Sequence, residues 1–135
     1  LNRTIIPAMT LDQYNAYCAT LPAAFHAVQW GDADVWKVGT AKTFKVFAIG
    51  GHEGENGPAV TFKVSEIGWE ILQDAPGCRP APYLASRGMK WIQADLKGGL
   101  KAKELKQYLE ASHALVAAGL PKKLRNKKSL QTEAL

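Results

Sequence analysis

The chain has no apolar run long enough to cross a membrane, and it has only two cysteines among 135 residues. A membrane-spanning helix needs about 18 consecutive apolar residues, so we expect no membrane partner. Cys18 and Cys78 are too few for a disulfide framework. Residues 1–7 lack the long apolar stretch of a secretory signal. These absences predict a protein of the reducing cytoplasm.

Histidine is also scarce, and its distribution argues against a metal site. His26, His52 and His113 lie in separate segments, and none has a second ligand at metal-binding spacing. We therefore expect no metal and no cofactor. His52 falls in the glycine-rich segment 50–57, which is interpreted as a solvated hairpin loop. That segment is not a P-loop, because it lacks Lys, Ser and Thr at phosphate-cradling spacing.

No constellation of nucleophile, base and charge-stabilising group is present, so we expect no enzyme. Cys18 belongs to an apolar helical stripe and is predicted to be a buried, inert thiol. Cys78 stands next to Arg79, whose charge would lower the pKa of the thiol, but a reactive role is not favoured. His113 is interpreted as a residue on the flank of a helix. An enzyme with a small-molecule pocket is the least favoured hypothesis.

Three helices are predicted from caps and apolar spacing. Thr10 and Gln13 form a capping-box pattern that begins the first helix, which the apolar stripe extends to residue 21. The apolar side of the second helix is expected to consist of Ile67, Ile71 and Leu72. The longest helix is expected at residues 101–118, where Gly119 and Pro121 end it.

Five strands are predicted, at residues 25–30, 35–38, 43–49, 59–64 and 89–95. In the third, alternation places Phe44, Val46 and Ala48 on one face and Lys45, Phe47 and Ile49 on the other. Residues 75–82 contain three prolines and are expected to form a loop. Short turns between neighbouring strands favour an α+β fold, a two-layer sandwich with an antiparallel sheet of about five strands and helices on one face.

The charge of the chain is concentrated near its end. The chain has 17 Lys and Arg against 12 Asp and Glu, and five of the seven residues 122–128 are basic. The other 12 basic residues balance the acidic ones, so the net charge of +5 comes from this segment alone. A positive field focused in one place indicates a polyanionic partner. We expect one domain at residues 1–125 and a basic, flexible tail at 126–135.

Two motifs carry a family resemblance. One is Pro-Gly-Cys-Arg-Pro at residues 76–80, and the other is Leu-Pro-Lys-Lys-Leu-Arg at residues 120–125. With these motifs the chain resembles the MmcQ/YjbR family of small bacterial proteins. The resemblance implies a CyaY-like, frataxin-like topology and a DNA-binding role in which two β-hairpins act as wings.

The chain departs from the family pattern after Tyr83, where many relatives carry two histidines that are missing here, although Lys90 and Trp91 are kept. The first helix carries only Asp12 in place of the acidic ridge of frataxins, so iron binding is not expected.

The favoured hypothesis is a non-enzymatic DNA-binding module that contacts phosphates through basic side chains. The candidate residues are Lys42, Lys45, Arg87, Lys90, Lys122, Lys123, Arg125, Lys127 and Lys128. The alternative is a protein–protein interaction domain without nucleic-acid binding, whose contact surface is the exposed aromatic residues of the sheet and the 76–82 loop. A third interpretation treats the basic residues as a solvated face that complements the carbonyl end of the last helix. A monomer is favoured, and Glu53 and Glu55 argue against a DNA-binding wing at their loop.

Overall fold

The computed structural model describes residues 7–125, and its first helix, α1 (Leu11–Cys18), begins at the predicted capping box. The Thr10 hydroxyl accepts from the Gln13 N–H at 3.1 Å, and the Gln13 side chain accepts from the Thr10 N–H at 2.9 Å. The helix ends at Cys18 instead of continuing to residue 21. The basic tail predicted at residues 126–135 lies outside the described residues.

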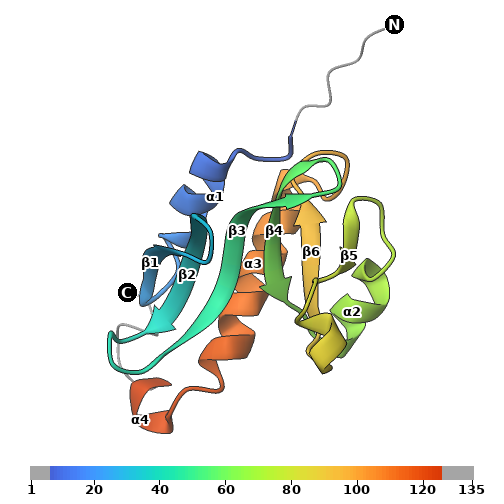
Figure 1. Cartoon of the computed structure of the whole chain (residues 1–135). Coiled ribbons are helices and arrows are strands. Elements are labelled where there is room, and N and C mark those ends of the chain that lie inside the picture. The colour runs from blue at the N-terminus through green and yellow to red at the C-terminus, as the bar shows by residue number, and fades with distance from the viewer. Residues whose placement is uncertain (1–6, 126–135) are drawn as a thin grey trace, which may run out of the picture.

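The described chain forms one open antiparallel sheet with helices packed on one side (Figure 1). The strands lie in the order β1-β2-β3-β4-β6-β5. Their bounds are β1 (Ala24–Gln29), β2 (Ala33–Gly39), β3 (Phe44–Gly54), β4 (Gly57–Lys63), β5 (Cys78–Pro80) and β6 (Trp91–Asp95). The helices after α1 are α2 (Glu66–Leu72), η1 (Ala85–Arg87), α3 (Ala102–Ala117) and α4 (Lys122–Arg125). The α+β prediction is confirmed, and the frataxin-like topology stays a prediction.

The segment expected to be a proline-rich loop contains a sixth strand, β5. Its three residues pair with β6, with Cys78 opposite Ala94 and Pro80 opposite Ile92. Proline is tolerated here because β5 is an edge strand, where a missing N–H on the outer side costs no ladder bond. The loop prediction was therefore wrong for residues 78–80.

The glycine-rich segment 50–57 is mostly strand, which corrects the prediction of a solvated loop. Gly54 pairs with Gly57, so the turn between β3 and β4 consists of Glu55 and Asn56 alone. Gly57 has a φ of 94°, which a residue with a side chain rarely adopts. The glycines thus serve a tight, ordered hairpin whose tip is held against the rest of the sheet.

The face of α2 that is buried differs from the prediction. Ile67 and Ile71 are 73% and 55% exposed, whereas Gly68 and Leu72 are buried. Gly68 and Leu72 are four residues apart and share one helical face, while the two isoleucines form the neighbouring face. The absence of a side chain at Gly68 allows the helix to approach Val64 closely. Residue hydrophobicity alone did not identify the buried face.

A β-bulge in β3 changes which of its side chains face the helices. The register with β2 shifts between Trp36 and Lys37, so strict alternation fails there. Phe47 and Ala48 are consecutive, yet both are fully buried in the core. Val46 and Ile49 are left on the opposite face of the sheet, which the helices do not cover.

Strands β3 and β4 separate where α3 crosses them, and Ser112 of α3 bridges the gap. Its hydroxyl accepts from the Lys63 N–H at 2.9 Å and donates to the Phe47 carbonyl at 2.7 Å. The last residues paired directly at this end of the two strands are Ala48 and Phe62. One hydroxyl thus takes the place of a direct ladder bond, and it fixes the distance between the strands.

Candidate functional site

A groove of about 800 Å³ lies on the sheet face opposite the hydrophobic core, and we call it the open-face groove. Its floor is a cross-strand row in which Ile49 pairs with Thr61 and Thr61 pairs with Gln93. The adjacent pair, Lys63 and Trp91, lines the same groove. The floor therefore combines apolar and polar side chains from three neighbouring strands.

Two aromatic side chains at the rim of the groove are exposed, and the backbone of both residues has a positive φ. Trp30 is 54% exposed with a φ of 55°, and Tyr83 is 85% exposed with a φ of 68°. The left-handed region is costly for bulky residues and tends to persist at functional sites. The Trp30 carbonyl accepts a hydrogen bond from His52 at 2.7 Å, and the Tyr83 carbonyl accepts one from the Ser86 hydroxyl at 2.8 Å. Both backbones are therefore held in place.

The His52 bond also corrects the prediction for that residue. A carbonyl oxygen can only accept, so His52 Nε2 must carry the proton in its bond to Trp30. The side chain is anchored on β3 and lines the groove instead of belonging to a solvated loop.

Helix α3 supplies the wall at one end of the groove, because it lies where β3 and β4 separate. Leu115, Val116 and Gly119 line the groove from this side. The methylene chain of Lys45 lies against Gly119, so closely that a Cβ there would contact the Lys45 side chain at 3.0 Å. This contact directs one predicted phosphate-binding residue to the rim of the groove.

The predicted basic residues divide into two groups. Lys42 lies in the turn before β3, and the exposed Lys122 and Lys123 lie on α4. Figure 1 shows α4 at the same end of the sheet as this turn. We call these three lysines and Lys45 the basic cluster; of the four, only Lys45 lines the groove. At the opposite end of β3, Glu53 lines the groove, and the distance between Lys45 and Glu53 along the strand is roughly 25 Å. The groove is therefore positive at one end and negative at the other.

The remaining predicted basic residues lie elsewhere. Lys90 pairs with Glu66 at 3.6 Å and lies over the Trp69 ring, 5.3 Å from its centroid, so it is already engaged. Arg87 is exposed on η1. Arg125 ends α4, and the structure does not describe its side chain; Lys127 and Lys128 lie outside the described residues. Sequence reasoning missed Lys63, which stands inside the groove.

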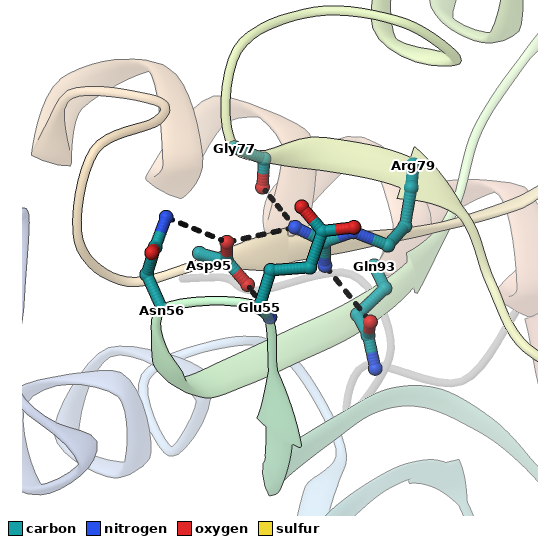
Figure 2. Close-up of polar contacts among 6 residues, drawn as sticks. All are labelled: Glu55, Asn56, Gly77, Arg79, Gln93 and Asp95. Atoms are coloured by element: carbon teal, nitrogen blue, oxygen red, sulfur yellow. Dashed lines mark hydrogen bonds and ion pairs between the residues drawn. The ribbon is translucent and has the colours of Figure 1, made fainter.

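A buried ion pair explains the Pro-Gly-Cys-Arg-Pro motif. Arg79 Nη2 lies 2.7 Å from Asp95 Oδ2, and the Asp95 side chain is fully buried (Figure 2). The carboxylate also accepts from the Glu55 N–H at 3.2 Å and from Asn56 Nδ2 at 3.5 Å. A Cβ at Gly54 would collide with the Asp95 carboxylate. The network fastens the β3–β4 turn to β5 and β6.

The other Arg79 nitrogens hold groups on both sides of the guanidinium (Figure 2). Nη1 donates to Gln93 Oε1 at 2.8 Å, Nη2 donates to the Gly77 carbonyl at 3.4 Å, and Nε lies 3.5 Å from the exposed Glu55 carboxylate. The signal for this network was in the sequence, because Gln and Asp recur at alternate positions of the buried strand β6. Sequence reasoning did not connect them to Arg79.

Both cysteine thiols in the described part of the chain have raised pKa values. Burial raises the pKa of Cys18 strongly, and it raises the pKa of Cys78 to about 11, because the opposing effect of Arg79 is smaller. The prediction that Arg79 lowers the pKa of Cys78 was therefore wrong, because the net shift is upward. His113 is more buried than predicted, and its Nε2–H donates to the Pro22 carbonyl at 2.7 Å.

Residues 7–125 contain no group of three His, Cys, Asp or Glu side chains that could hold a metal ion. No helix in this part of the chain is long and apolar enough to span a membrane.

Comparison with known proteins places this fold in a family. The crystal structure of Deinococcus radiodurans protein DR2400, with its DUF419 domain, is 23% identical and has a TM-score of 0.77, with 98% of this chain and 96% of that chain covered. A protein from Pseudomonas syringae is 25% identical with a TM-score of 0.63, covering 79% of this chain and 98% of its own. A search of curated proteins found no match. A family model described as YjbR matches residues 19–115, well over half of the sequence, and the chain therefore belongs to the YjbR family.

Proposed function

We propose that the protein is a non-enzymatic module that binds single-stranded nucleic acid in the open-face groove. The observation that carries this proposal is the combination of the rim aromatics with Lys45 at one end of the groove, on the side of the sheet where the rest of the basic cluster lies. Trp30 and Tyr83 are exposed, and an exposed aromatic ring stacks on a base by about 1–3 kcal/mol. Lys45, Lys122 and Lys123 supply the phosphate contacts that give most of the sequence-independent affinity.

Single strands fit this surface better than a duplex. In a duplex the bases are stacked on one another, so aromatic side chains in a groove gain nothing from them. In a single strand the bases can be splayed onto Trp30, Tyr83 and the floor beside Trp91. Glu53 at the far end repels phosphates, so the backbone is expected to enter at the Lys45 end.

Two further features agree with this assignment. The side chains that line the groove are mostly apolar, which suits the stacking of bases. Both cysteines are free and buried, which suits a protein of the reducing cytoplasm.

A protein-interaction role is the second candidate, and one observation favours it. Ile67 and Ile71 are exposed on one face of α2 and are not among the residues that line the groove. An apolar pair of this kind can anchor a protein partner. Such binding would be insensitive to salt and would be lost on the double change of both isoleucines to serine.

Fluorescence anisotropy with ten-nucleotide DNA and RNA strands and a matched duplex tests the proposal at two salt concentrations. Changing Lys45, Lys122 and Lys123 together to Gln is expected to weaken single-strand binding and to reduce the slope of log K against log salt by about 2. The matched control changes three exposed lysines near the start of α3, Lys97, Lys101 and Lys103, which removes the same charge elsewhere. Absence of binding at low salt, or equal loss in both triple variants, would refute the proposal.

A further inference from the structure

The side-chain amide of Gln93 has a forced orientation on the groove floor. The Arg79 guanidinium can only donate hydrogen bonds, so the Gln93 atom 2.8 Å from Nη1 must be the amide oxygen. The amide nitrogen therefore lies on the side away from Arg79, as Figure 2 shows. Gln93 is only 6% exposed and lines the groove, and this nitrogen has no hydrogen-bond partner within residues 7–125.

Two neighbours of Gln93 share this property. Thr61 is its cross-strand partner, is 7% exposed and lines the groove, and its hydroxyl has no partner in the described part of the chain. Trp91 is also buried and lines the groove, and among the described residues its indole N–H is likewise without a partner. Native proteins rarely leave buried polar groups unpaired, and unpaired groups in a cavity mark the place where a ligand or water completes them.

The chemistry of the three groups defines what would satisfy them. The Gln93 amide nitrogen and the indole N–H donate only, and the threonine hydroxyl can donate. All three can therefore donate a hydrogen bond to an oxygen that has free lone pairs. The three donors carry no charge, and the Arg79 charge behind Gln93 is already neutralised by Asp95, so a neutral carbonyl oxygen is sufficient to satisfy them.

We infer that Gln93, Thr61 and Trp91 form a recognition site for the ring carbonyl of a planar base. The inference rests on the proposed function and adds base preference to it. Thymine and uracil present carbonyl oxygens at the edge of the ring, whereas adenine has none. The site therefore selects carbonyl-bearing bases over adenine, while Arg79 acts as the positioning residue that fixes the Gln93 amide.

The test compares ten-nucleotide oligomers of deoxythymidine and deoxyadenosine by anisotropy with three variants. Thr61→Val removes one hydroxyl with little change of shape. Gln93→Glu keeps an oxygen for Arg79 but replaces the donor that faces the groove with an acceptor. Gln29→Glu is the matched control, because Gln29 also accepts from a basic side chain, Lys37, and is not among the residues that line the groove.

We expect the ratio of thymidine to adenosine affinity to fall about fivefold in Thr61→Val and about tenfold in Gln93→Glu, and to stay unchanged in Gln29→Glu. Stacking within the free oligomers contributes equally to this ratio in every variant, so it does not affect the comparison between variants. Salt-dependent binding with an unchanged ratio in both groove variants would overturn the base-recognition site and leave the proposed function standing. Absence of binding to both oligomers would overturn both.

Discussion

Replacing Ser112 with alanine is the sharpest test of how the sheet is held open. The side chain is fully buried, and its hydroxyl satisfies the Lys63 N–H and the Phe47 carbonyl. Ser112→Ala leaves both backbone groups buried without a partner, at about 1–3 kcal/mol each. The higher helix propensity of alanine returns about 0.5 kcal/mol. We expect a net loss of about 1.5–5.5 kcal/mol in the free energy of unfolding.

Urea denaturation followed by circular dichroism measures this loss. Ser86→Ala is the matched control, because that hydroxyl donates to the exposed Tyr83 carbonyl, which water can satisfy instead. The control is expected to change stability by less than about 0.5 kcal/mol. A loss below about 0.5 kcal/mol in Ser112→Ala would show that β3 and β4 close directly on one another, and it would refute the bridging role of the hydroxyl.

Two further predictions concern buried groups. Arg79→Met leaves the Asp95 carboxylate buried without its counter-charge and should cost about 3–5 kcal/mol in a urea titration, whereas Glu55→Gln, whose carboxylate is exposed, should cost less than about 1 kcal/mol; equal losses would contradict the network. Burial lowers the pKa of His113 in the folded state, so the unfolded chain binds the proton first as the pH falls. The contribution of His113 to stability is therefore fully present above its unfolded pKa of about 6.5. It is lost as the pH falls from there through the lower pKa of the folded state. Thermal melts should show this loss in the parent protein and a shallower one in His113→Gln, and identical pH profiles would contradict it.

Local signals in the sequence predicted much of the fold. The Thr10 capping box and the regular apolar stripe of α3 depend on residues within one turn of each other, so they can be recognised without tertiary information. The five predicted strands follow from the same kind of local pattern. The strand β5 was missed because its pairing with β6 is non-local and its prolines are typical of loops. The bulge at Phe47 is equally non-local, since it depends on the register with β2.

The candidate site was less predictable than the fold. The basic residues Lys45, Lys122 and Lys123 were identified from charge alone; of these three, only Lys45 lines the groove. The polar floor was missed, because Gln93 and Thr61 are ordinary strand residues until the sheet order makes them neighbours. No rule of spacing within one segment could have brought them together.

Because α3 lies where β3 and β4 separate, one helix belongs to both sides of the sheet. Val116 is part of the hydrophobic core and also lines the open-face groove. A molecule bound in the groove would therefore contact Val116, four residues after Ser112 on the helix that packs against the core. Binding in the groove is therefore expected to rigidify α3, and slower amide exchange along this helix would report it.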